Sequence, residues 1–181
     1  NSYIVCQDGN DLVLVDQHAA HERIGFEQLR RQFRAGHVQR QTLLFPVMLE
    51  LDFREAEQLL EQLDSLEQLG FEIEHFGGRS FALKGIPQLL AQNEAEQLVR
   101  DLAAEIAQLG QSALAEESLD RVLILMACHS VVRANQSLSG EEMRALLQEL
   151  DRVDFSAHCP HGRPVLVRQS LAEINRMFKR S

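Results

Sequence analysis

Three residues near the N-terminus have the types and the spacing of a metal site. Asp16, His18 and Glu22 lie within one short stretch of the chain. Residues four apart in a helix share a face, so His18 and Glu22 would point the same way, directly after Asp16. An imidazole with carboxylates suits Zn²⁺ or Mn²⁺. The alternative is the ordinary solvated first turn of a helix, where such residues are also common.

A second candidate lies near the C-terminus, in the segment Cys159-Pro160-His161-Gly162-Arg163-Pro164. It offers a thiol and an imidazole two positions apart. Pro160 restricts the backbone and Gly162 permits a positive φ, so we expect a rigid loop that presents both groups together. The alternative is a buried cysteine beside a surface histidine.

Neither segment alone supplies the four ligands of a closed metal site. Together they offer five candidate ligands: Asp16, His18, Glu22, Cys159 and His161. Cys128 adds a second thiol on an apolar stretch. A mixed set of nitrogen, oxygen and sulfur ligands can hold two ions, and paired ions activate water and stabilise the leaving oxygen in phosphodiester cleavage. Spacing alone leaves open whether the two segments meet.

Hydrophobic periodicity predicts the elements that must position these residues. Apolar runs on either side of Asp8-Gly9 predict a hairpin. Asp52 and Glu55 form a capping box that starts a helix, and Gly70 ends it. The expected strands are 3–5, 12–15, 42–52, 71–74, 80–83 and 165–167. The expected helices are 17–34, 53–69, 94–109, 118–133, 139–150 and 171–178.

This order predicts an α/β (α+β) fold with mixed or antiparallel sheets and flanking helices. Weak breaks near 39–42 and 110–117 divide the chain into two lobes. The first and last segments, 1–42 and 117–181, would form one lobe that carries the metal site. Residues 43–116 would form the other.

Composition limits the class of protein. The 181 residues, 45% of them hydrophobic, can build one core or two small lobes. No apolar run approaches the ~20 residues of a membrane span. Three widely spaced cysteines make no disulfide framework and favour a reducing, cytosolic setting. The chain begins with Asn1 and shows no signal peptide, so we expect a piece of a longer protein.

The net charge is −9 and the isoelectric point about 5.2. Affinity for duplex DNA comes largely from the neutralisation of phosphates by Lys and Arg. We therefore expect this chain to hold DNA poorly by itself and to need a partner that delivers it.

The segment from Asp16 to Glu27 resembles the endonuclease signature of MutL-type mismatch-repair proteins: Asp-Gln-His-Ala, two residues, Glu, four residues, Glu. Two further family motifs follow in order. Residues 127–134 resemble the family's Ala-Cys-Lys-Ser-type helix, with His129 where a basic residue is common. Residues 159–164 resemble its Cys-Pro-His-Gly-Arg-Pro loop. The resemblance covers nearly the whole chain, which looks like the C-terminal domain alone.

The resemblance implies a metal-dependent endonuclease that nicks one strand of double-stranded DNA. It places Zn²⁺ or Mn²⁺ among Asp16, His18, Glu22, Cys159 and His161, with Cys128 nearby. It also implies a homodimer formed by the lobe 1–42 and 117–181, and an external, regulatory lobe 43–116. ATP would bind only in an absent N-terminal part, and a mismatch-recognition protein would bind the full-length protein. The expected location is the bacterial cytoplasm at the nucleoid, with no membrane partner.

Glu27 belongs to the same signature and is counted with the catalytic residues Asp16, His18 and Glu22. In one continuous helix it lies ~140° round from Glu22, at ~100° per residue. We therefore expect it not to bind the same ion directly but to pair with Arg23, Arg30 or Arg31. The alternative is an exposed ion pair of little consequence.

The segment from Gln41 to Pro46 carries another family feature. Gln41, Leu44 and Pro46 match a motif, Gln, two residues, Leu, one residue, Pro, that resembles the one by which MutL proteins dock on the replicative sliding clamp. An amide and apolar anchors on an extended segment suit a shallow groove. In the alternative, the segment is a strand that turns Leu43 and Phe45, or Leu44, into the protein's own core.

Two other functions remain open at this stage. One is a dimerisation scaffold with a structural zinc, and the other is an unrelated zinc hydrolase that acts on small substrates. A structural zinc prefers Cys and His and has little need for Asp16, Glu22 and Glu27 together. The intact carboxylate set therefore favours the nuclease.

Overall fold

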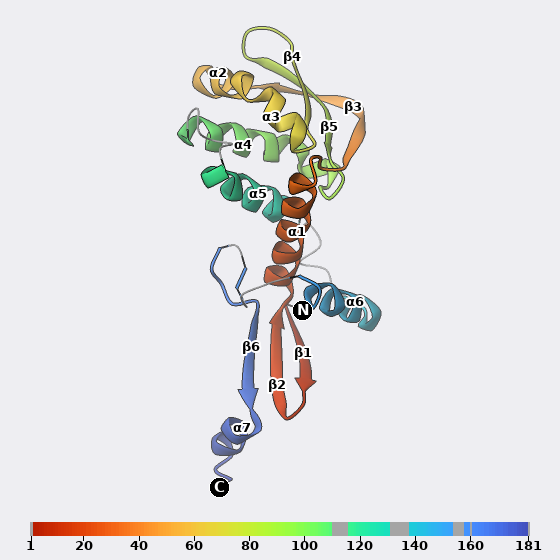
Figure 1. Ribbon diagram of the computed structural model, residues 1–181, viewed down its shortest axis with the longest axis vertical. Coiled ribbons are helices and arrows are strands. Elements are labelled where there is room, and N and C mark those ends of the chain that lie inside the picture. Colours follow the sequence, from red (N-terminus) through yellow and green to blue (C-terminus); the bar gives the residue numbers. More distant parts are fainter. Residues whose placement is uncertain (1, 110–115, 131–137, 154–157, 160, 181) are drawn as a thin grey trace. The chain divides into compact units, whose positions relative to one another are not determined.

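The computed structural model describes residues 2–109, 116–130, 138–153, 158–159 and 161–180, and Figure 1 shows its helices and strands. These residues form two compact units. The first unit comprises Asn1–Ile24 and Val131–Ser181, and the second comprises Gly25–Ser130. Helix α1 (Gln17–Arg34) begins in the first unit and ends in the second.

The boundaries of these units differ from the predicted positions 42 and 117. The reason is that the later turns of α1 bury Phe26 and Leu29 in the core of the second unit, where Val122 and Met126 of α5 (Glu116–Ser130) are also buried. Apolar side chains therefore assign the later turns of α1, together with α5, to the second unit. The dimerising and regulatory roles of the two lobes stay predictions.

The first unit is built on a small antiparallel sheet in the order β1-β2-β6. Strands β1 (Tyr3–Asp8) and β2 (Asp11–Asp16) form the predicted hairpin, and Gly9 turns it with a φ of 61°. Strand β6 (Leu166–Ser170) pairs with β2, so Val15 lies opposite Leu166. Helices α6 (Gly140–Leu150) and α7 (Leu171–Met177) complete this unit.

The two faces of this sheet have different surroundings, because successive side chains of a strand point to opposite faces. Ile4, Val13 and Val15 are buried in a core with residues of α1 and α6. On the alternate positions, Tyr3, Val5 and Val167 are exposed. One face of the sheet is thus packed, and the other presents apolar side chains.

The second unit contains the antiparallel sheet β3-β5-β4, formed by β3 (Arg40–Glu50), β4 (Glu72–His75) and β5 (Ser80–Pro87). Its helices are α2 (Phe53–Glu61), α3 (Leu63–Gln68), α4 (Ala95–Leu109) and α5, with a short 3₁₀ turn at Gln92–Glu94. Phe81 and Leu83 of β5 share a buried core with apolar residues of α4 and α5. The two antiparallel sheets with flanking helices confirm the predicted α+β class.

One predicted helix is divided. The capping box of Asp52 and Glu55 starts α2 as expected, but the helix expected over 53–69 breaks at Gln62. There the backbone N–H donates to the carbonyl of Leu59, three residues back, which closes the last turn tightly and redirects the chain into α3. Three predicted features fall on residues outside the described ranges. They are the end of the expected helix and motif at 131–134, most of the predicted break at 110–117, and Pro160.

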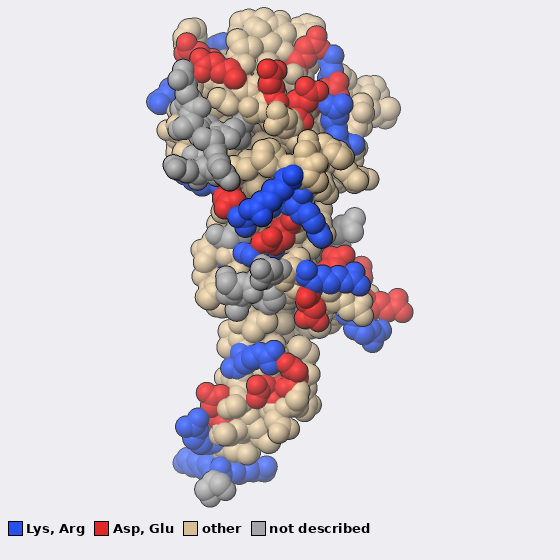
Figure 2. Space-filling view, viewed as in Figure 1, with Lys and Arg blue, Asp and Glu red and all other residues tan. Residues whose placement is uncertain are grey.

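Among the helices described, none is long and apolar enough to cross a membrane. On the face drawn in Figure 2, acidic and basic side chains are interspersed over the described surface. Together with the net charge of −9, this gives the face little of the continuous positive potential that holds a DNA backbone.

Candidate metal centre

Glu22 is the centre of the candidate site. It lies in the second turn of α1, and only 2% of its surface is exposed. A buried carboxylate must be compensated by opposite charge or hydrogen bonds. His18, one turn earlier, places its Nε2 3.1 Å from the Glu22 Oε1, as the four-residue spacing predicts. Two further partners come from the distant C-terminal loop.

That loop is a tight turn between Cys159 and Arg163. The backbone N–H of Cys159 donates to the carbonyl of Arg163 (2.7 Å), and the N–H of Gly162 donates to the carbonyl of Cys159 (2.9 Å). Gly162 has a φ of 82°, in the left-handed region that favours glycine, as the sequence predicts. The turn thereby presents the buried Cys159 and the exposed His161 together.

The pairing of β2 with β6 brings this loop to α1. Because Val15 lies opposite Leu166 in this antiparallel pair, Asp16, which follows Val15, meets Val165, which precedes Leu166. The N–H of Asp16 donates to the carbonyl of Val165 (2.8 Å). Helix α1 starts directly after Asp16, and only Pro164 separates the turn from Val165. The first turns of the helix and the loop therefore lie side by side.

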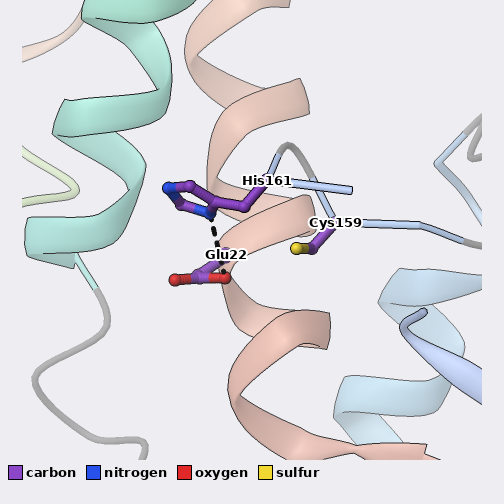
Figure 3. Close-up of side chains that lie close together, drawn as sticks. All are labelled: Glu22, Cys159 and His161. Carbon is purple, nitrogen blue, oxygen red and sulfur yellow. Dashed lines mark ion pairs between the residues drawn. The ribbon is translucent and has the colours of Figure 1, made fainter. Parts of the chain in front are cut away.

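Three side chains meet in this place, as Figure 3 shows. Single ligand atoms of Glu22, Cys159 and His161 all lie within 4.8 Å of one another. The Nδ1 of His161 is 3.6 Å from the Oε2 of Glu22. Ligand bonds of ~2.0–2.3 Å at tetrahedral angles put ligand atoms roughly 3.3–3.8 Å apart, so small side-chain rotations would close this set around one ion. The oxygen, sulfur and nitrogen donors together fit Zn²⁺, and of these donors the carboxylate of Glu22 also suits Mn²⁺.

Asp16 has a structural role of its own. Its Oδ1 accepts hydrogen bonds from the backbone N–H groups of His18 (2.9 Å) and Ala19 (3.0 Å). These are the second and third residues of α1, so Asp16 caps the N-terminus of the helix. The second carboxylate oxygen of Asp16, Oδ2, takes no part in these two hydrogen bonds. Asp16 thus borders the cluster without being one of its three closest members, and its role as a metal ligand stays a prediction.

Arg163 is a member of the site to which the sequence analysis assigned no role. Its Nη2 lies 3.2 Å from the Glu22 Oε2 and 3.5 Å from the Oε1. A hydrogen bond to Cys159, the charge of Glu22 and, more weakly, the charge of Asp16 raise the pKa of Arg163. Its place in the Cys-Pro-His-Gly-Arg-Pro segment was the one available signal.

Two predicted site residues belong to the second unit. Cys128 is half-buried on α5, and Glu27 is half-buried on α1 beyond Ile24. The continuous helix Gln17–Arg34 keeps Glu27 on a different face from Glu22, as expected. Of its suggested partners, Arg30 forms an ion pair with Asp120 at 3.7 Å. The roles of Cys128 and Glu27 stay predictions.

The segment Gln41–Pro46 lies in β3, where the register with β5 shifts between Thr42 and Val47. The irregularity turns Leu43 into the core and leaves Leu44 and Phe45 83% and 77% exposed, next to the exposed Pro46. The Nε2 of Gln41 donates to the carbonyl of Leu90 (2.7 Å), so its amide is bound within the second unit. Of the residues that the alternative expects in the core, Leu43 is buried there, whereas Leu44 and Phe45 are not.

The sequence is similar to known proteins over its whole length. The sequence model of a family described as "MutL C terminal dimerisation domain" matches residues 1–138. The chain is 57% identical over 181 residues to the DNA mismatch repair protein MutL of Syntrophotalea carbinolica, and 50% identical over 179 residues to that of Geobacter sulfurreducens. These alignments cover 100% and 99% of the chain but only 29% and 30% of the relatives' length.

Proposed function

Because the chain belongs to the family of MutL C-terminal dimerisation domains, we propose that it is the metal-dependent endonuclease domain of a mismatch-repair protein. It would nick one strand of duplex DNA and join two copies of its parent protein. The observation that carries the nuclease is the cluster of Glu22, Cys159 and His161, whose ligand atoms lie within 4.8 Å of one another. An ATP site, and contact with a mismatch-recognition protein, would belong to the rest of the parent protein.

Glu22, Cys159 and His161 would hold the ion, with His18 and Asp16 at the border of the set. A bound Zn²⁺ or Mn²⁺ supplies a Lewis acid for the phosphodiester and acidifies water. The residues themselves supply the geometry: Glu22 is fixed by burial, and Cys159 by the hydrogen-bonded turn. His161 is exposed and faces the solvent from which DNA would approach.

A scaffold with a structural zinc is the second candidate function. Structural zinc sites are closed by four protein ligands, mainly Cys and His, whereas catalytic sites have three and keep a position open. Within the part of the first unit that the structure describes, the compact group has three members, one of them a carboxylate. This arrangement favours the catalytic site.

Replacement of Asp16 tests whether its carboxylate takes part in nicking. We expect Asp16→Asn to keep the helix cap, since Asn and Asp cap helices about equally well, but to remove the carboxylate. Nicking of supercoiled plasmid with Mn²⁺ should fall at least ~10-fold, by analogy with the effect of groups that tune metal sites, while the melting temperature stays unchanged. Glu27→Gln, assayed in parallel, should lose nicking but keep its metal content.

Full nicking by Asp16→Asn would show that Asp16 only caps α1. Nicking that resists a chelator would discard the metal dependence, and the absence of nicking in the wild type with either Mn²⁺ or Zn²⁺ would discard the endonuclease itself. The dimerisation scaffold would then be the remaining function.

We further propose that the segment around Leu44 docks on the replicative sliding clamp. Leu44 and Phe45 are apolar, adjacent and almost fully exposed beside Pro46, which makes them suitable anchors for a shallow groove. Such a clamp encircles DNA, and it would deliver an acidic domain that binds duplex weakly. Gln41, whose amide bonds to Leu90, would set the shape of the segment.

The clamp proposal predicts a selective loss. Leu44→Asp with Phe45→Ser should abolish clamp stimulation of nicking and leave the basal rate unchanged, because both side chains already face solvent. The matched control is Phe53→Ser, an equally exposed aromatic residue on α2. Nicking should be assayed with and without the clamp. Equal loss of basal and stimulated nicking would contradict the docking role.

The exposed face of the β1-β2-β6 sheet is the surface that we propose for dimerisation. Tyr3, Val5 and Val167 are exposed there, over a hollow of about 510 Å³. Its lining also includes Leu14 and Val165, together with Asp16 and Arg163. Apolar patches of this kind on a soluble domain mark interaction surfaces. The name of the matching family supports a second copy of the chain as the occupant.

A further inference from the structure

Arg163 supplies the permanent cation beside the buried carboxylate of Glu22. The other two neighbours of this carboxylate, His18 at 3.1 Å and His161 at 3.6 Å, are charged only when they are protonated. Arg163 adds a permanent cation at 3.2 Å from the same carboxylate, yet its side chain remains 57% exposed. A guanidinium so placed has one end at the ligand cluster and most of its surface toward solvent.

The backbone around Arg163 is held on both sides. Its carbonyl accepts from the N–H of Cys159 (2.7 Å), and the following residues join the sheet through the Asp16–Val165 hydrogen bond (2.8 Å). The pairing of His158 with Pro164 closes the same loop. Arg163 is therefore fixed relative to the cluster by the same turn that positions Cys159 and His161.

Guanidinium carries five N–H donors in a rigid planar fork that matches the oxygens of a phosphate. The hydrogen bonds to Glu22 use one terminal nitrogen, Nη2, and the side chain makes a further hydrogen bond to Cys159. The exposed remainder of the fork can donate to an anion that approaches the cluster from solvent. A phosphodiester is such an anion, and its negative charge develops further during cleavage.

We propose that Arg163 is a substrate-binding residue that anchors on Glu22 and donates to the phosphodiester of the DNA strand being cut. This inference rests on the proposed endonuclease function. The role of Arg163 differs from that of the metal ligands, because Arg163 would contact the substrate whereas the ligands would hold the ion. Loss of Arg163 should therefore spare metal binding and impair nicking.

The test compares Arg163→Gln and Arg163→Lys with the wild-type chain, and uses Arg168→Gln as the matched control. Arg168 lies on β6 in the same unit, paired with Asp8, and its replacement makes the same change in net charge. We expect Arg163→Gln to bind Mn²⁺ within about threefold of wild type by titration calorimetry. Its kcat/KM for nicking should fall roughly 100-fold, as when one donor to a developing oxyanion is lost.

The salt dependence of nicking distinguishes a phosphate contact from a structural role, because a purely structural role of Arg163 would leave it unchanged. A lost phosphate contact should make the slope of log(kcat/KM) against log[KCl] shallower by about 0.9 for Arg163→Gln and leave it unchanged for Arg168→Gln. Arg163→Lys keeps a cation beside Glu22, which protects the fold, but lacks the fork. It should retain the wild-type slope with about tenfold lower nicking.

Three results would overturn the inference while wild-type nicking stands. They are unchanged nicking in Arg163→Gln, Mn²⁺ affinity reduced tenfold or more in that variant, or full activity in Arg163→Lys together with a wild-type salt slope in Arg163→Gln. Absence of metal-dependent nicking in the wild type would instead overturn the proposed function itself.

Discussion

Glu22→Gln should lose at least ~100-fold in Mn²⁺ affinity and nearly all nicking, since groups that only orient metal ligands already contribute 10–100-fold. The change preserves the shape of the side chain but replaces the carboxylate at the centre of the cluster with a neutral amide. Glu22 is the one member of the cluster that His161, His18 and Arg163 all contact. No other single substitution in the described site removes so many interactions.

Metal content by mass spectrometry and plasmid nicking measure this effect. The matched control is Glu141→Gln, an exposed carboxylate on α6 of the same unit, which should retain both properties. If Glu22→Gln kept its metal, Glu22 would be a buried structural partner of Arg163 and not a ligand. Circular dichroism should show intact helices, so that loss of metal is not loss of fold.

Val5→Lys should convert the dimer to a monomer. In a twofold dimer the same patch is used by both copies, so one substitution places two ammonium groups in the apolar interface. Charges buried or juxtaposed there cost several kcal/mol, which corresponds to a dissociation constant raised about 1000-fold. Val5 is exposed in the single chain, so the fold itself should be unaffected.

Analytical ultracentrifugation across a concentration series checks this prediction. Phe53→Lys is the control, because Phe53 is also apolar and exposed but lies on α2 of the second unit. A Val5→Lys protein that stays dimeric, with a Phe53→Lys protein that dissociates, would move the interface to the second unit. Nicking by monomeric Val5→Lys would further show that each copy carries a complete site.

Local sequence signals determined most of the elements. The Asp8-Gly9 turn, the capping box of Asp52 and Glu55, and the helix from Gln17 to Arg34 are all found as predicted. They depend on residues only a few positions apart, whose steric and hydrogen-bonding preferences act within the segment. The break at Gln62 was missed because the backbone of a single residue redirects the chain without a glycine or proline to mark it.

The sequence by itself also determined the chemistry that this protein can offer. It places carboxylates, imidazoles and a thiol in two short segments, and the family resemblance groups these segments into one site. Only the tertiary structure decided which of them meet. The register that places Val15 opposite Leu166 joins the loop to α1, and Glu22, Cys159 and His161 come together as a result, while Asp16 caps the helix. The role of Arg163 depends on this long-range pairing, because a contact between residues 22 and 163 is set by strand register and leaves no periodic pattern in either segment.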